Sequence, residues 1–339
     1  MKSPFSKRIT IESLAESSDP KDREELARRL AGILPNFCAV PEYVNYFRLW
    51  EDHGFHLVPV HYSQPIPEVK SLPEHLFEEE HPMAGVDMNV DTQLLLLTRI
   101  FPQFREEYNK FPRKQTPIPH EFYFDNEMFS GTDALALYCV IRHFKPRRII
   151  EIGGGFSTRV IAQACVRNGN VELVTIDPYP DPILMSGFPG LTRCIPARVQ
   201  DVELNIFQEL QEGDILFIDS SHVVRCGGDV NRLYLKVLPI LRKGVIVHAH
   251  DIFLPYEYPR SWVLEQFRFY SEQYLLHAFL MFNSEFEVLL CNSYLGKKHI
   301  DELRTTFPLS PWWSNGGSLW MSRGHIDIRG AEYMGQPHF

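Results

Sequence analysis

The chain has 339 residues, of which 44% are hydrophobic and 23% charged, so it is long enough for one large domain or two with an ample core. Its formal charge is −9 and it has no long Lys/Arg run, which argues against a nucleic-acid-binding face, and no apolar run is long enough to span a membrane. The N-terminal residues lack the apolar core of a signal peptide. Six cysteines without a C-x-x-C pair predict free, mostly buried thiols, no structural zinc and a cytoplasmic protein.

Residues 1–118 are predicted to form an N-terminal accessory region that is helical and rich in aromatic residues. A helix is expected to begin at Asp19 and to end before Pro35, and Asp91–Ile100 is predicted to be a buried helix. Between them Val58–Tyr62 is predicted to be a strand. Two interpretations stay open for this region: a lid or substrate pocket, or a helical cap that covers one side of a sheet.

A strand, a glycine turn and a helix are predicted in the stretch RRIIEIGGGFSTRVIAQA. The apolar run Ile149–Ile152 ends in three glycines, and a helical pattern begins at once with Ser157 at the expected N-cap. Gly153 and Gly155 lack a Cβ atom, so a ligand can approach the backbone closely. The helix N-terminus then offers free N–H groups to a polar ligand.

A second strand, Glu172–Ile176, ends in Asp177, where nucleotide-binding α/β folds place an acid that hydrogen-bonds a ribose. A dinucleotide site would require G-x-G-x-x-G, but here the second glycine is followed by Phe, Ser and Thr. An acid, Glu151, instead precedes the first glycine by two residues. The order acid-x-Gly-x-Gly, followed by an acid at the end of the next strand, resembles motifs I and II of the class I S-adenosylmethionine (SAM) methyltransferases. The alternative is an ordinary βα turn with a structural Asp.

This resemblance implies that the glycines face the methionine part of SAM and that Asp177 holds the ribose hydroxyls. The family's segment before motif I folds over the SAM carboxylate, so Ser130 and Thr132 would either donate hydrogen bonds there or cap the helix that they open. The family's motif III touches adenine, and Gln200, Asp201 and Val202 fall at that place. The cofactor-binding residues implied by the resemblance are Glu151, Gly153, Gly155, Ser157, Asp177, Ser130, Asp201 and Val202.

Two further apolar strands are each followed directly by acids and histidines. Asp214–Ile218 leads into Asp219 and His222, and Val245–Val247 leads into His248–Ala249–His250–Asp251. Ligands of open α/β sheets bind outside the carboxyl ends of the strands. Side chains two residues apart share a face of a strand, so we expect His250 and Asp251 at the site and His248 packed between sheet and helix.

An Asp–His–Asp group can hold a divalent cation, which would bind a substrate hydroxyl beside the methyl donor. The pattern resembles the metal-dependent O-methyltransferases of natural-product biosynthesis, in particular those acting on macrolide sugars. Asp219-x-x-His222 matches their metal ligand and catalytic base, so Asp219 and His222 are the predicted catalytic residues. The predicted metal ligands are Asp219, His250 and Asp251. His250 replaces the family's first acid, so the identity of the metal stays open. The options are Mg²⁺, a softer metal such as Mn²⁺, Fe²⁺ or Zn²⁺, or no metal.

The predicted fold is an α/β, doubly wound, mostly parallel seven-stranded sheet of the Rossmann-like class I methyltransferase type. The methyltransferase domain is predicted over 119–325, with a tail at 326–339, a long helix over Trp262–Phe282, and Glu287–Cys291 and Ser318–Ser322 as a closing antiparallel strand pair. The predicted function is SAM-dependent methyl transfer to a hydroxyl of a small molecule or sugar, without nucleic-acid or membrane partners; a homo-oligomer is compatible with the sequence. The alternatives are a non-catalytic SAM-binding protein and a metal-dependent enzyme of the same fold with another reaction, such as an oxidoreductase.

Overall fold

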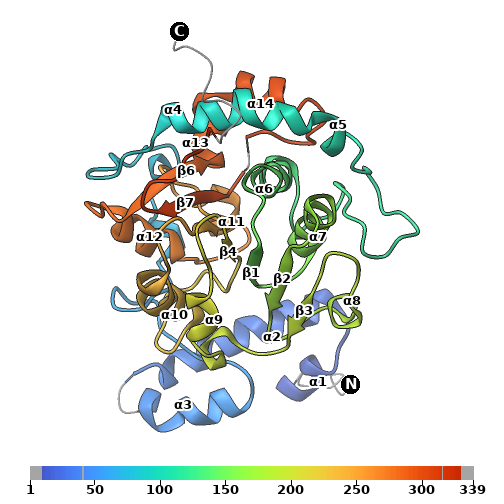
Figure 1. The fold of residues 1–339 in the computed structure, drawn as a ribbon. Coiled ribbons are helices and arrows are strands. Elements are labelled where there is room, and N and C mark those ends of the chain that lie inside the picture. The colour runs from blue at the N-terminus through green and yellow to red at the C-terminus, as the bar shows by residue number, and fades with distance from the viewer. Residues whose placement is uncertain (1–9, 40–41, 315, 330–339) are drawn as a thin grey trace, which may run out of the picture. The chain divides into compact units, whose positions relative to one another are not determined.

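Seven strands form one sheet with the order β3-β2-β1-β4-β5-β7-β6 (Figure 1). The computed structural model describes residues 10–39, 42–314 and 316–329. The strands are β1 (Arg148–Ile152), β2 (Glu172–Ile176), β3 (Arg193–Ile195), β4 (Ile215–Ile218), β5 (Ile246–Ala249), β6 (Phe286–Cys291) and β7 (Leu319–Arg323). The first five pair in parallel, while β7 runs antiparallel to both β5 and β6. The predicted doubly wound, mostly parallel sheet is therefore confirmed.

Helices cover both faces of the sheet (Figure 1). The central strands are mostly apolar because both of their faces are buried. Ile149 and Phe217 belong to one hydrophobic cluster, which includes residues of α6 and α7. Ile150 and Leu216 belong to a second cluster on the opposite face, together with residues of α12. Successive side chains along each strand thus point to opposite faces, and the two buried faces divide the core into two layers.

The chain divides into two compact units, residues 1–73 and 74–339. The first contains α1 (Ile11–Ala15), α2 (Pro20–Ile33), α3 (Glu42–Asp52) and the 3₁₀ turns η1 (Leu34–Phe37) and η2 (Val69–Ser71). Asp19 caps α2 as predicted by accepting a hydrogen bond from the Lys21 N–H. The strand predicted at Val58–Tyr62 is wrong, because this segment forms loop and turn.

The second unit contains the sheet and the remaining described helices. The α-helices are α4 (Val90–Leu95), α5 (Arg105–Tyr108), α6 (Gly131–Phe144), α7 (Phe156–Asn168), α8 (Pro182–Ser186), α9 (Asn205–Gln208), α10 (Asp229–Arg232), α11 (Arg260–Leu264), α12 (Glu272–Leu280), α13 (Asn292–Lys298) and α14 (Ile300–Thr306). The 3₁₀ and π segments are η3 (Glu74–Phe77), η4 (Leu96–Ile100), η5 (Phe101–Phe104), η6 (Val199–Asp201), η7 (Leu233–Val237) and η8 (Leu238–Ile240).

Residues 74–118, which the sequence predicts to be part of the accessory region, fall in the compact unit that holds the sheet. Leu96, Leu97 and Phe101 are buried in the same cluster as the residues of α6, which explains the placement. The long helix predicted over Trp262–Phe282 is wrong, because α11 ends at Leu264 and α12 begins only at Glu272. In the intervening loop Phe267 has a φ of 55°, a left-handed conformation that interrupts a helix.

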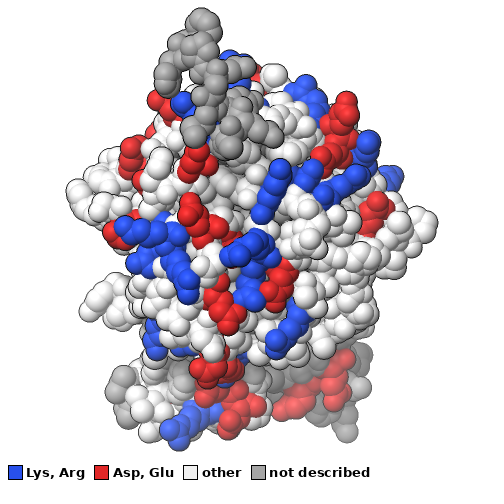
Figure 2. All heavy atoms as spheres, in the orientation of Figure 1, with Lys and Arg blue, Asp and Glu red and all other residues white. Residues whose placement is uncertain are grey.

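No helix in the described ranges combines the length and apolar character needed to cross a membrane. All six cysteines are free; Cys139, Cys165 and Cys291 are buried and Cys226 is exposed. Figure 2 shows basic and acidic side chains mixed over one face of the molecule.

Candidate active site

The glycine turn after β1 brings two strand ends into contact. The Gly153 N–H donates to the Ile176 carbonyl and the Asp219 N–H donates to the Ile152 carbonyl, each with a donor–acceptor distance of 2.9 Å. Gly153 has a φ of +81°, and a Cβ atom at this position would lie 1.8 Å from the Asp219 carbonyl oxygen. Only glycine therefore allows the ends of β1 and β4 to lie this close.

Glu151 lies beneath this turn and supports it. Its carboxylate is fully buried and accepts hydrogen bonds from the hydroxyls of Ser157, Thr158 and Thr175 at distances of 2.6–2.7 Å. Burial raises the pKa of Glu151 to about 7, although the three hydroxyls oppose the shift. These bonds connect β1, β2 and the first turn of α7. The N-cap of α7 is Gly155 instead of the predicted Ser157, whose hydroxyl is engaged by Glu151.

Asp177 stands at the end of β2, as predicted. One carboxylate oxygen accepts from the Gly154 N–H at 2.9 Å and the other from the Tyr179 N–H at 2.6 Å. The side chain thus faces the glycine turn across the top of the sheet. These bonds leave lone pairs on both carboxylate oxygens for a further donor.

A cavity of about 530 Å³, here called the turn cavity, opens beside these residues. Its walls include the three glycines and the ends of β2, β4 and β5, with Asp177, Asp219, His222 and His250. Gly155 leaves open space where a Cβ atom would stand. The volume lies within the usual range for small-ligand sites.

The acids and histidines predicted at the ends of β4 and β5 come together. His222 Nε2 lies 3.2 Å from an oxygen of Asp219 and 3.4 Å from one of Asp251, and His250 Nε2 lies 3.5 Å from the other oxygen of Asp251. His222 and Asp251 both have left-handed backbones, with φ of 60° and 55°. Such strain persists where the surrounding structure fixes it, and it is often found at functional sites.

Glu272 completes this cluster and was missed by the sequence analysis. Its carboxylate is fully buried and accepts a hydrogen bond from His222 Nδ1 at 2.9 Å. The N–H groups of Ser271 and Glu272 also donate to the His222 carbonyl. The start of α12 therefore fixes both the backbone and the ring of His222. In the sequence Glu272 looked like one more acid within a long helix.

The cluster changes the proton affinity of its members. Burial would lower the pKa of His222, but the hydrogen bonds and charges of Asp219 and Glu272 outweigh it and raise this pKa well above its usual value. Burial likewise opposes ionisation of Asp219, yet the adjacent His250 and His222 lower its pKa. Burial raises the pKa of Asp251. The two carboxylates of Asp219 and Glu272 therefore favour the protonated form of the His222 ring.

The predicted metal site is not formed by these side chains. Among residues 10–39, 42–314 and 316–329, no group of three or more His, Cys, Asp or Glu side chains is arranged to hold a metal ion. The ring of His222 takes the place between the carboxylates of Asp219 and Asp251 where a cation would bind. As folded, the carboxylates of Asp219 and Asp251 both lie close to the ring of His222.

Four other residues singled out from the sequence lie outside this cluster. His248 is fully buried as expected, with its ring stacked on Phe217 and its Nε2 at 2.9 Å from the Ser318 hydroxyl. Ser130 donates its hydroxyl to the Phe124 carbonyl and lines a second cavity. Asp201 is paired with Arg198 at 2.8 Å, and Val202 packs against the core; neither lines the turn cavity.

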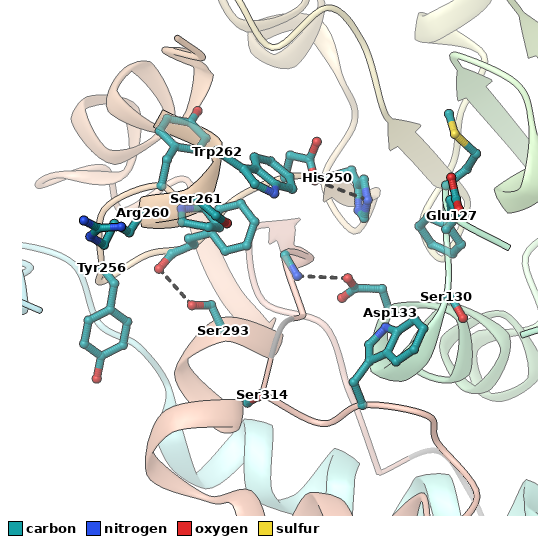
Figure 3. A pocket seen from close by; sticks show the side chains of 18 of the residues that line it. Glu127, Ser130, Asp133, His250, Tyr256, Arg260, Ser261, Trp262, Ser293 and Ser314 are labelled. Carbon is teal, nitrogen blue, oxygen red and sulfur yellow. Dashed lines mark hydrogen bonds and ion pairs between the residues drawn. The ribbon is translucent and has the colours of Figure 1, made fainter. Parts of the chain in front are cut away.

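That second cavity, here called the aromatic cavity, has a volume of about 860 Å³ (Figure 3). Tyr256, Trp262 and Trp312 are among its walls. It adjoins the turn cavity along a shared boundary. The shared residues are Glu127, Met128, Phe129, His250, Asp251 and Trp262. The site thus has two chambers, with His250 and Asp251 at their junction.

Comparison with known proteins gives one family match and one close relative. Residues 150–252 match the model of a family described as a methyltransferase domain. This stretch runs from β1 to just past Asp251. An uncharacterized protein of Archaeoglobus fulgidus is 31% identical over 166 residues, which cover 46% of this chain and 75% of that protein.

Solved structures give more distant likenesses. One is the O-methyltransferase TomG of Streptomyces achromogenes, involved in tomaymycin synthesis and solved in complex with SAM; identity is 14%, coverage 68% of this chain and 90% of that chain, and TM-score 0.34. Another is a proposed O-methyltransferase from Klebsiella pneumoniae, with 14% identity, coverage of 70% and 96%, and TM-score 0.32.

Proposed function

This chain belongs to the class I SAM-dependent methyltransferases, and we propose that it transfers a methyl group from SAM to a hydroxyl of a small-molecule acceptor, sugars included. The observation that carries the proposal is the pair of adjoining cavities. The turn cavity has the glycines and the strand-end acid of a SAM site, and the aromatic cavity adjoins it at His250 and Asp251.

The residues of the turn cavity suit SAM. Open space at Gly155 and the free N-terminus of α7 would receive the polar methionine part, and Asp177 would accept hydrogen bonds from the ribose hydroxyls. Bound SAM would supply an electrophilic methyl group, activated by the sulfonium charge. The protein then has to align the acceptor hydroxyl with this methyl group and remove the hydroxyl proton.

His222 is the proposed base for this proton. His222 lines the turn cavity, and its Nδ1 is bonded to Glu272, which fixes the orientation of the ring. Because Asp219 and Glu272 raise its pKa, the neutral form that accepts a proton becomes abundant only at alkaline pH. Asp219 and Asp251 stabilise the imidazolium that results. No step of this mechanism uses a metal ion.

The test is methyl transfer from radiolabelled SAM to a panel of hydroxyl compounds, with His222→Asn compared with the wild type. We expect turnover in the wild type and a loss of about 10²–10⁴-fold in the variant, the usual contribution of a general base. SAM binding without transfer to any acceptor would favour a non-catalytic SAM-binding protein. Full turnover in the variant would refute the base assignment.

A further inference from the structure

The aromatic cavity has the position expected of the acceptor site, provided that the proposed function holds. SAM would occupy the turn cavity, so the acceptor must reach the methyl group from the adjoining chamber. The boundary between them includes Phe129, His250, Asp251 and Trp262. The lining of the aromatic cavity therefore reports on the chemistry of the acceptor.

Flat aromatic rings enclose this cavity from several elements. Trp262 lies on α11, Tyr256 on the loop after β5, Phe129 before α6, and Trp312 on the segment before β7. Trp312 is 43% exposed, so its ring is not fully buried in the core. Figure 3 shows Tyr256 and Trp262 on one side of the cavity and Glu127, Ser130 and Asp133 on the other. Such walls favour a ligand with a flat ring, through stacked or edge-to-face contacts.

The ionisable side chains that line the cavity are mainly acidic. The basic residues are Arg260 and Lys297, together with His250 at the junction of the two cavities. The carboxylates are Asp125, Glu127, Asp133, Asp251 and Glu257.

The two cations are already engaged. Arg260 makes two bonds of 2.8 and 2.9 Å to Glu74 and a third of 3.4 Å to Glu265. Lys297 lies over the ring of Tyr256, with 5.6 Å between its ammonium nitrogen and the ring centroid. Of the carboxylates, Asp125 is paired with Arg113 at 3.2 Å. An anionic group would therefore meet the remaining carboxylates and no free guanidinium among the residues that line the cavity.

Glu127 stands out among the carboxylates. It is exposed, lines both chambers, and has no ion-pair partner within 4.0 Å among the residues that the structure describes. Asp133, by contrast, accepts from Asn292 and from the N–H groups of Gly317 and Ser318. Glu127 is thus available to attract a positive group on a ligand held between the aromatic walls.

We infer that the acceptor is a flat aromatic alcohol whose side chain is cationic or uncharged. Nucleotides, sugar phosphates and carboxylate-bearing acceptors are disfavoured by the acidic lining. A basic amine on the acceptor would be held by Glu127 and by the aromatic faces, with the hydroxyl directed to the junction at His250 and Asp251. Sugars, which lack an aromatic ring, bind less well.

The experiment measures dissociation constants by calorimetry, with and without S-adenosylhomocysteine, for matched phenols that differ only in the side chain. Tyramine, 4-ethylphenol and 4-hydroxyphenylacetate form one such series, and glucose is the sugar probe. We expect the amine to bind about tenfold or more tightly than the carboxylate, because a unit charge a few ångströms away shifts affinity by that order. Equal binding of the three, tighter binding of the carboxylate or glucose, or no binding of any phenol would overturn the inference.

Two variants locate the effect. Glu127→Gln should weaken the amine about three- to tenfold and leave 4-ethylphenol unchanged. Glu203→Gln, which removes an exposed acid that lines neither cavity, should leave all three unchanged. An unaltered amine preference in Glu127→Gln would also overturn the inference. Because binding is measured directly, the acceptor class and the proposed methyl transfer can fail separately: phenol binding without SAM binding refutes only the latter.

Discussion

Glu272 offers the sharpest test of how the site is held together. Its carboxylate is fully buried, lies 2.9 Å from Nδ1 of His222, and was not identified from the sequence. Glu272→Ala removes one partner of a buried ion pair, which typically costs about 3–5 kcal/mol of unfolding free energy. Glu272→Gln keeps an acceptor oxygen and loses the charge, so we expect a smaller cost of about 1–2 kcal/mol. The measurement is equilibrium urea unfolding.

The pH dependence separates the charge from the packing. Folding raises the pKa of His222, so the protonated ring adds stability that is complete below its unfolded pKa of about 6.5 and is lost as the pH rises through the higher folded pKa. Glu272→Gln removes one cause of this shift. The difference in unfolding free energy between wild type and variant should therefore be largest below pH ~6.5 and shrink at alkaline pH.

The matched control is a surface pair of the same chemistry. Glu287 lies 3.3 Å from His325, whose side chain is 82% exposed. Glu287→Gln should change stability by less than about 1 kcal/mol, because exposed ion pairs are screened by solvent. Equal losses for Glu272→Gln and Glu287→Gln, or a loss for Glu272→Gln that does not depend on pH, would refute the reasoning.

Three further predictions concern the turn and the cluster. Gly153→Ala should reduce the unfolding free energy by more than the roughly 1–2 kcal/mol of left-handed strain, because the new Cβ atom would collide with the Asp219 carbonyl. In Gly155→Ala the new Cβ atom meets no other atom within 4 Å, so this variant should fold normally by urea titration but bind SAM more weakly. Glu151 has a pKa raised to about 7, so the stability that its protonation contributes is complete below pH ~4.5 and is lost as the pH rises through 7. The effect is about 3 kcal/mol of unfolding free energy. Glu151→Gln should abolish this pH dependence, as measured by unfolding at pH 5 and pH 8. Treatment with a strong chelator should leave methyl transfer intact, and a loss restored by one divalent metal would show that the cluster rearranges to bind it.

Much of the fold could be predicted from local patterns. β1, β2, β4 and β5 are short apolar runs buried on both faces, and each is bounded by a glycine or an acid, so their positions are visible along the chain. Parallel strands place their carboxyl ends at one edge, which is why Asp219, His222, His250 and Asp251 could be expected together. The alternation of side chains also predicted correctly that His248 is buried.

Other features depend on tertiary contacts that no local pattern reveals. Glu272 is fifty residues from His222 in sequence, and their contact requires α12 to dock beside the end of β4. The predicted helix over Trp262–Phe282 is interrupted because Phe267 adopts a left-handed backbone. Val58–Tyr62 has strand-like composition but pairs with none of the strands in the described part of the chain. The contact of His222 with Glu272 also places the His222 ring beside Asp219, which the sequence predicted as a metal ligand.

The most direct test of the central claim is calorimetric titration of the protein with SAM, performed on the wild type, Asp177→Ala and the control Asp301→Ala. Asp177 lines the turn cavity, whereas Asp301 is on the exposed surface of α14. We predict micromolar binding to the wild type and the control, and a loss of about tenfold or more in Asp177→Ala, since hydrogen bonds from hydroxyls to a carboxylate contribute about 1.5–3 kcal/mol. Absence of SAM binding to the folded wild type would contradict the account, and undiminished binding to Asp177→Ala would contradict its assignment of the ribose contact.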